Sequence, residues 1–191
     1  TFETREGILK HCSVKNAHDL GDVGERFIQK SHPSLEAQLA NLADEIAYNN
    51  HDIDDGVRSG LITVQQLREV PIFNAEYETV MTRYPQLDER RLVHEIVRRL
   101  IGNMVIDLTE TSSRFIQASG VNSLDSVRQY AQPLIRYSVE LLEQKNVLKR
   151  FLYQNLYMHP QVYRMSRQSQ RIIPAPLEEY MNDARLFPAK Y

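Results

Sequence analysis

Cysteine is almost absent from this chain of 191 residues, which contains only Cys12. A lone cysteine excludes an internal disulfide and is typical of a reducing compartment, so we expect a cytoplasmic location. Glycine and proline are also scarce, with seven and eight residues, which excludes collagen-like and low-complexity chains. Hydrophobic residues make up 42% of the sequence. These proportions predict a globular domain of ordinary size and disfavour a disordered segment.

Long apolar runs and an excess of basic charge are missing as well. No segment approaches the roughly 18 consecutive apolar residues of a transmembrane helix, and the N-terminal TFETREGILK lacks the pattern of a signal peptide. We therefore expect neither. The net charge of −2 disfavours a globally basic nucleic-acid-binding protein but allows local basic patches. The GxxxxGK, GxSxG, HExxH and paired CxxC motifs are absent too, which argues against the chemistries they serve.

Apolar residues recur at spacings of three and four along most of the chain, and no window of six residues alternates as a half-buried strand would. This periodicity predicts an all-α fold. We expect helices over residues 2–12, 35 to about 50 or 52, 63–70, 72–84, 88–118, 123–132 and 138–159, and short helical segments in the tail. Because there is no repeat and no long linker, residues 1–191 are expected to form a single helical unit.

Local signals predict several boundaries of these helices. Ser34 and Asp88 are suited to cap the starts of two long helices, and Gly120 is suited to end the second. The aspartate-rich IDDG sequence is expected to follow the end of the first long helix. The run that contains Gly21 and Gly24 is expected to be a loop.

The segment from Ser34 to Gly60, SLEAQLANLADEIAYNNHDIDDGVRSG, predicts a helix with two different faces. At about 100° per residue, four apolar side chains fall within a wedge of roughly 60°: Leu35, Leu39, Leu42 and Ile46. Asp44, Tyr48 and Asp52 lie roughly 150° from the centre of that wedge, about 6 Å apart along the axis. Carboxylates in such a row can bind a divalent metal or a sugar hydroxyl, and a phenol can pack between them. Spacing alone favours a solvated face, because acidic residues are mostly exposed.

Arg91, His94 and Arg98 fall within roughly 60° on one face of the expected long central helix. A basic group of this kind can hold a triphosphate, because the planar fork of arginine bonds two phosphate oxygens at once. The alternative is an exposed face that pairs with neighbouring acids such as Glu89 or Glu95, and spacing alone favours it.

Arg164, Arg167 and Arg171 repeat this spacing near the C-terminus. They could contact phosphate, a nucleotide effector or a nucleic-acid backbone. No aromatic residues of a recognised nucleic-acid-binding module lie among them, so a plain charged surface is the favoured interpretation. A nucleic-acid partner has no further support from the sequence.

Three stretches of the sequence resemble one family: ANLADEIAYNNHDIDDGVRSGLI, LDERRLVHEIVRRLIGNMVIDL and FLYQNLYMHPQVYRMSRQSQRII. They are similar to bacterial deoxyguanosine triphosphate triphosphohydrolase (dGTPase)-like proteins of the HD-domain superfamily. The resemblance implies a multi-helical HD-domain-like bundle, a divalent Mg or Mn ion, a homo-oligomer, and cleavage of a deoxynucleoside triphosphate (dNTP) to deoxynucleoside and triphosphate. It also implies that Asp44 matches the last metal ligand, Tyr48 the tyrosine beside the deoxyribose, and Asp52 the acid that receives the sugar 3′-hydroxyl.

The resemblance further implies that the chain holds only part of such an enzyme. Family members also bind the metal through a His and a His-Asp pair, many residues before the position of Asp44, and only 43 residues precede it here. Neither His18-Asp19 nor His51-Asp52 fits, because the first is expected in a loop and the second follows Asp44. TFETREGILKH is itself similar to a family segment downstream of those ligands. We therefore expect the C-terminal half of the enzyme, without the upstream catalytic histidine. The alternative is a non-catalytic helical regulatory or oligomerisation domain.

Overall fold

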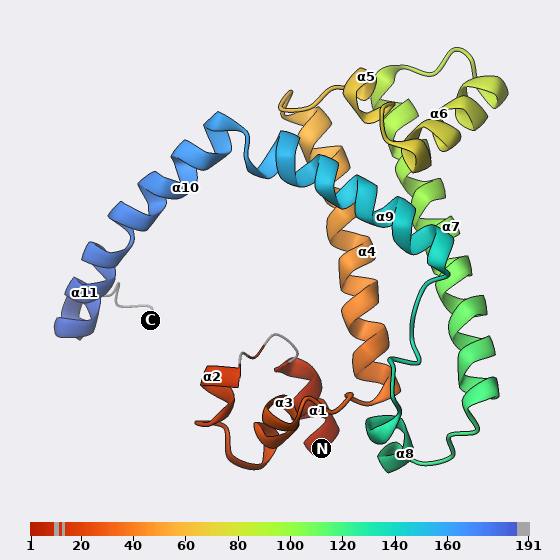
Figure 1. The fold of residues 1–191 in the computed structure, drawn as a ribbon. Coiled ribbons are helices and arrows are strands. Elements are labelled where there is room, and N and C mark those ends of the chain that lie inside the picture. The colour runs from red at the N-terminus through yellow and green to blue at the C-terminus, as the bar shows by residue number, and fades with distance from the viewer. Residues whose placement is uncertain (10–11, 13, 187–191) are drawn as a thin grey trace.

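The computed structural model describes residues 1–9, 12 and 14–186, and every regular element in these ranges is a helix (Figure 1). The predicted all-α fold is therefore confirmed. The elements are α1 (Phe2–Ile8), α2 (Val14–Ala17), η1 (Gly21–Val23), α3 (Glu25–Gln29), α4 (Leu35–Arg58), α5 (Val64–Leu67), α6 (Pro71–Arg83), α7 (Glu89–Ser119), α8 (Leu124–Gln129), α9 (Val139–Leu152), η2 (Tyr153–Tyr157), α10 (Pro160–Ile172), α11 (Pro174–Asn182) and η3 (Ala184–Leu186). Across the described part of the chain, no helix combines the length and apolar character that crossing a bilayer requires.

The predicted caps are present. Ser34 Oγ accepts a hydrogen bond from the backbone N–H of Ala37 at 3.3 Å, and Asp88 Oδ1 accepts one from the N–H of Arg91 at 3.0 Å. These bonds satisfy N–H groups that have no partner inside the first turn of a helix. Gly120 ends α7 with a φ of 67°, in the left-handed region that glycine tolerates.

α4 is longer than the sequence predicts. The expectation that it ends at about residue 50 or 52, before IDDG, is wrong, because the helix continues to Arg58. Gly56 is buried within the helix, and a Cβ built on it would lie only 2.7 Å from Cδ1 of Ile62. This glycine therefore makes room for the chain that returns after α4.

The expected loop around Gly21 and Gly24 instead contains the short elements α2, η1 and α3. A Cβ on Gly24 would lie 1.9 Å from the backbone oxygen of Ala17, so the chain packs here too closely for any side chain. The predicted helix over residues 2–12 ends at Ile8, and Lys10 and His11 lie outside the described residues.

A fully buried carboxylate fastens these N-terminal elements to the rest of the molecule. Glu6 of α1 is 0% exposed. Arg26 Nε lies 2.6 Å from its Oε1, and Arg128 Nη2 lies 3.3 Å from its Oε2. Because Arg26 belongs to α3 and Arg128 to α8, one charge network joins three helices, which compensates the cost of removing the carboxylate from water.

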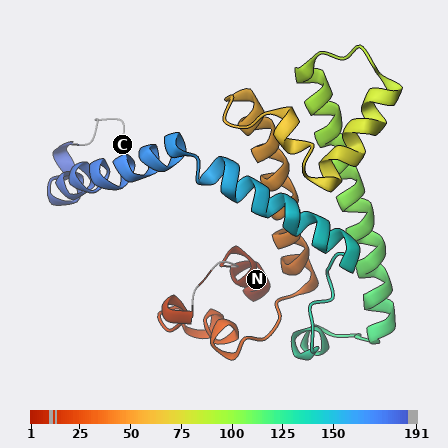
Figure 2. The same cartoon turned by 45° about the horizontal axis from the view of Figure 1, so that its top comes forward.

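α7 forms the centre of the core, as its length and apolar content predict. It packs against α4 and α6, while α9 packs across α4 (Figures 1 and 2). The fully buried side chains of α7 follow a helical period: Ile96, Leu100 and Met104. Ile106 is 57% exposed, so the helix buries one side only. Leu39 of the predicted apolar wedge on α4 is likewise 49% exposed, because the core covers that face only from Leu42 onward and part of Leu35.

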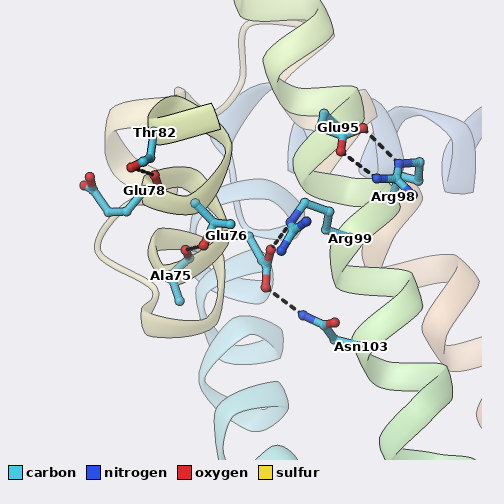
Figure 3. Close-up of polar contacts among 9 residues, drawn as sticks. Ala75, Glu76, Glu78, Thr82, Glu95, Arg98, Arg99 and Asn103 are labelled. Carbon is cyan, nitrogen blue, oxygen red and sulfur yellow. Dashed lines mark hydrogen bonds and ion pairs between the residues drawn. The ribbon is translucent and has the colours of Figure 1, made fainter. Parts of the chain in front are cut away.

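A glutamate joins α6 to α7 (Figure 3). Glu76 is 8% exposed. Its Oε2 accepts a hydrogen bond from Arg99 Nε at 2.5 Å, and its Oε1 accepts one from Asn103 Nδ2 at 2.6 Å. Since both donors belong to α7, this carboxylate fixes how the two helices sit along one another.

The predicted helix over residues 138–159 is divided in two. α9 ends at Leu152 and is followed by the π-helical turn η2, in which the N–H of Met158 donates to the carbonyl of Tyr153 at 3.0 Å, five residues back. Beyond this turn, α10 and α11 leave the bundle together (Figures 1 and 2). We call residues 160–182 the arm.

Candidate functional site

Asp44, Tyr48 and Asp52 lie on one side of α4, as their four-residue spacing requires. The opposite side is held in the core by Ile46 and Ile53, which are 5% and 0% exposed. Tyr48 is 63% exposed, and the two carboxylates are partly buried. The packing of α4 thus sets its rotation, so that a row of oxygen-bearing side chains faces out of the bundle.

Tyr157 adds a second phenol to this row. Its hydroxyl donates a hydrogen bond to Oδ2 of Asp52. Burial, this hydrogen bond and the nearby charge of Asp52 raise the pKa of Tyr157 to about 12, and Tyr48 contributes in the same direction. The phenol of Tyr157 is therefore protonated at neutral pH and acts as a donor.

The sequence gives no direct signal for this contact. Tyr157 stands beside a leucine stripe, a position that is common for a rim aromatic, and it is 105 residues from Asp52. Only the crossing of α9 over α4 and the π-turn that follows bring the two side chains together. A tyrosine shortly before the helix-breaking His159-Pro160 is the one feature that could have drawn attention to it.

Glu45, beside the row, fixes α9 on α4. Lys145 Nζ donates to its Oε2 at 2.9 Å, and Lys149 Nζ donates to its Oε1 at 3.1 Å. Burial raises the pKa of Glu45, but the hydrogen bonds and charges of the two lysines outweigh it and hold the pKa below its ordinary value. Because α9 leads directly into η2, this pairing also helps to place Tyr157 against Asp52.

Arg91, His94 and Arg98 are exposed on α7. Each faces a carboxylate: Arg91 Nε lies 3.3 Å from Asp88, His94 Nε2 lies 3.7 Å from Asp54, and Arg98 Nη2 lies 2.6 Å from Glu95. Figure 3 shows the two parallel bonds between Arg98 and Glu95. The hydrogen bond from Arg98 lowers the pKa of Glu95, and Glu95 raises the pKa of Arg98.

The structure does not bring this basic group together with the acidic row. His94 approaches Asp54, which follows Asp52 by two residues on α4. At about 100° per residue, Asp54 lies roughly 160° around the helix from Asp52. The basic group and the acidic row therefore occupy opposite sides of α4.

The described residues do not form a metal site by themselves. Within residues 1–9, 12 and 14–186, no three His, Cys, Asp or Glu side chains gather where they could hold a metal ion. His18-Asp19 lies in a turn after α2, and His51-Asp52 lies within α4 beyond Asp44. If Asp44 is a ligand, further ligands must come from outside the described part of the chain.

Comparison with known proteins defines the class of protein first. A family model described as "Phosphohydrolase-associated domain" matches residues 135–191, which begin just before α9 and include the whole arm. This is therefore an all-helical protein with a phosphohydrolase-associated segment in its C-terminal part.

The full chain then identifies the family. It is 54% identical over 191 residues to the deoxyguanosinetriphosphate triphosphohydrolase-like protein of Thiobacillus denitrificans, 53% over 190 residues to that of Bordetella pertussis, and 50% over 191 residues to that of Ralstonia pickettii. The chain is a sequence of the dGTPase-like family, and the predicted resemblance is confirmed. The matches cover 100% of this chain but 49% to 50% of the relatives, so the chain spans about half their length.

Proposed function

We propose that this chain is the C-terminal part of a metal-dependent dNTP triphosphohydrolase that cleaves a dNTP to deoxynucleoside and triphosphate. The observation that carries the proposal is the outward row of Asp44, Tyr48 and Asp52 on α4, in a chain whose relatives are dGTPase-like by name. The other metal ligands and the catalytic histidine then belong to the half of those relatives that this chain does not span. The isolated chain is accordingly inactive.

Each member of the row has a proposed role. Asp44 supplies one oxygen ligand to a divalent ion, Mg or Mn, for which carboxylates are well suited. Such an ion polarises a phosphate and orients water when its site is complete. Tyr48 packs its exposed ring beside the deoxyribose and leaves little room for a ribose hydroxyl. Asp52 accepts a hydrogen bond from the 3′-hydroxyl through Oδ1, because Tyr157 already bonds Oδ2.

Arg91, His94 and Arg98 are the proposed contacts to phosphate. Exposed ion pairs contribute little free energy, so phosphate oxygens can displace the carboxylates that these residues face. Their place across α4 from Asp52 supports the alternative, a surface of ion pairs. In the longer protein, a raised KM for dNTP in Arg98→Ala but not in Arg90→Ala favours the phosphate role. An unchanged KM assigns the group to surface pairing.

Release of triphosphate by the longer protein that contains this chain tests the site. Each dNTP is assayed with Mn, and we expect Asp44→Ala to abolish the release. Asp55→Asn is the control, because Asp55 is exposed on the same helix and pairs only locally with Arg58. Absence of release by the wild-type protein, or full activity in Asp44→Ala, contradicts the proposal. Tyr48→Ala should also bring the kcat/KM values for deoxyribose and ribose substrates closer together.

A second candidate is a non-catalytic helical domain that regulates or assembles a partner. It is favoured by the lack of a cluster of metal-binding side chains among the described residues. A reading frame without a His and a His-Asp pair upstream of Thr1 supports this candidate, and a reading frame with them supports the enzyme. The homo-oligomer implied by the family resemblance is checked by light scattering on the purified protein.

A further inference from the structure

The arm, formed by α10 and α11, has no cover along most of its length. Every residue from Tyr163 to Asn182 is exposed, and both views show the two helices extending away from the bundle. Large apolar side chains are among them: Met165 is 62% exposed, Ile172 55%, Ile173 59%, Leu177 59% and Met181 81%. Apolar residues gathered in this way mark an interaction surface.

The apolar residues of α10 share one side of the helix. At about 100° per residue, Val162, Met165 and Ile172 fall within roughly 80° of one another. The arginines at 164, 167 and 171 centre roughly 150° away from them. An isolated helix of this length is only marginally stable in water, so burial of the apolar side is what would hold the arm in helical form.

The base of the arm lies beside the proposed site. Tyr157 bonds Asp52 and precedes Pro160, the first residue of α10, by three positions. Asp44 is two helical turns, about 12 Å, from Asp52 along α4. A polypeptide that binds the same metal ion as Asp44 must therefore pass close to the start of the arm.

We propose that the apolar side of the arm docks on the half of the dGTPase-like polypeptide that this chain does not span. The chain covers only 49% to 50% of its relatives, so a segment of similar length lies outside it, and the family description of residues 135–191 names a domain associated with a phosphohydrolase. A second copy of this chain would bring no further metal ligands to Asp44. The inference rests on the proposed function for the identity of the partner.

Cysteine accessibility tests this interface. This chain is compared with a chimera in which it replaces the matched half of the Thiobacillus denitrificans relative, both carrying Cys12→Ser. Met165→Cys and Ile172→Cys should react rapidly with a thiol reagent in the isolated chain and at least about tenfold more slowly in the chimera, because burial makes reaction depend on local opening. Arg167→Cys, on the opposite side of α10, is the matched control and should react rapidly in both.

Two results overturn the proposal. One is equally rapid reaction of Met165→Cys in the isolated chain and the folded chimera. The other is protection in the isolated chain that increases with its concentration, which assigns the surface to a second copy. If the chimera does not fold, the same substitutions at the aligned positions of the full-length Thiobacillus denitrificans protein give the same comparison. Because activity is not measured, protection without triphosphate release supports the interface while contradicting the proposed function.

Discussion

Tyr157 and Asp52 meet across the longest separation of any contact in the candidate site, and their pairing decides which oxygen of Asp52 faces outward. The phenol is partly exposed, yet burial and the adjacent carboxylate raise its pKa to about 12. It therefore holds its proton well above neutral pH. A bond of this kind fixes the rotamer of a carboxylate that would otherwise turn freely in water, which is what precise binding of a hydroxyl requires.

Replacement of Tyr157 by phenylalanine tests this contact. Tyr157→Phe should lower the free energy of unfolding by about 1 kcal/mol or less, because the lost bond is partly exposed. The folded pKa lies above the ordinary value of about 10, so the contribution is present below pH 10 and is lost as the pH rises through about 12. Urea unfolding at increasing alkaline pH should show a smaller decline in the variant. Tyr153→Phe, in the same turn, should behave as the wild type; an equal change in both variants argues against a specific role for the Asp52 contact.

At the scale of helices, single carboxylates set how pairs of helices lie against each other. Glu76 joins α6 to α7, and Glu45 joins α4 to α9. Apolar side chains supply most of the free energy of such packing but tolerate sliding, whereas a carboxylate with two donors has one good position. The row on α4 is displayed beside η2 because of this second pairing.

Glu45→Gln should remove part of the acid sensitivity of the protein. The folded pKa of Glu45 is lowered, so its contribution to stability is present above the ordinary pKa of about 4.3 and is lost as the pH falls through the lower folded value. Urea unfolding between about pH 6 and pH 3 should therefore show a shallower decline in the variant than in the wild type. Glu143→Gln, exposed on α9, is the control. A decline as steep as that of the wild type would mean that other carboxylates govern acid unfolding.

Glu76→Ala should destabilise the fold strongly. The change leaves Arg99, whose side chain is only 27% exposed, without its carboxylate, and we expect a loss of about 2 to 3 kcal/mol in the free energy of unfolding. Glu78→Ala, one turn away, removes an exposed pair with Arg68 and should cost less than about 1 kcal/mol. Chemical denaturation of the two variants gives the comparison, and similar losses would show that burial of Glu76 has no special consequence.

For the whole molecule, local signals predicted much of the fold. The periodicity and the caps at Ser34, Asp88 and Gly120 gave the all-α class and the course of the long helices, because these signals depend only on neighbours in sequence. The end of α4 was misplaced because Gly56 resembles a terminator but serves a close approach to Ile62. The row on α4 followed from the helical period alone.

The remaining parts of the site depend on contacts between distant segments. Neither the bond from Tyr157 nor the pairing of His94 with Asp54 can be derived from spacing, since both depend on how helices cross. The roles of Asp44, Tyr48 and Asp52 stay predictions that rest on family resemblance. Physical pattern alone favoured a solvated face for them.

Removal of the arm tests whether the bundle is complete without it. A chain that ends at His159 should unfold with a free energy within about 1 kcal/mol of the intact chain, because exposed residues add little to stability. Its helical content, measured by circular dichroism, should fall. A large loss of stability would show that the arm packs on the bundle in solution.

The π-turn at η2 has a consequence for how the arm tolerates insertions and deletions. Its hydrogen bond spans five residues where an α-helix would span four, so the turn accommodates one additional residue. Deleting a single residue between Tyr153 and Tyr157 would restore an ordinary helix, rotate everything that follows by about 100° and turn the phenol away from Asp52. The direction of the arm is thus encoded as a residue count, and length changes here should be far more damaging than substitutions at the same positions.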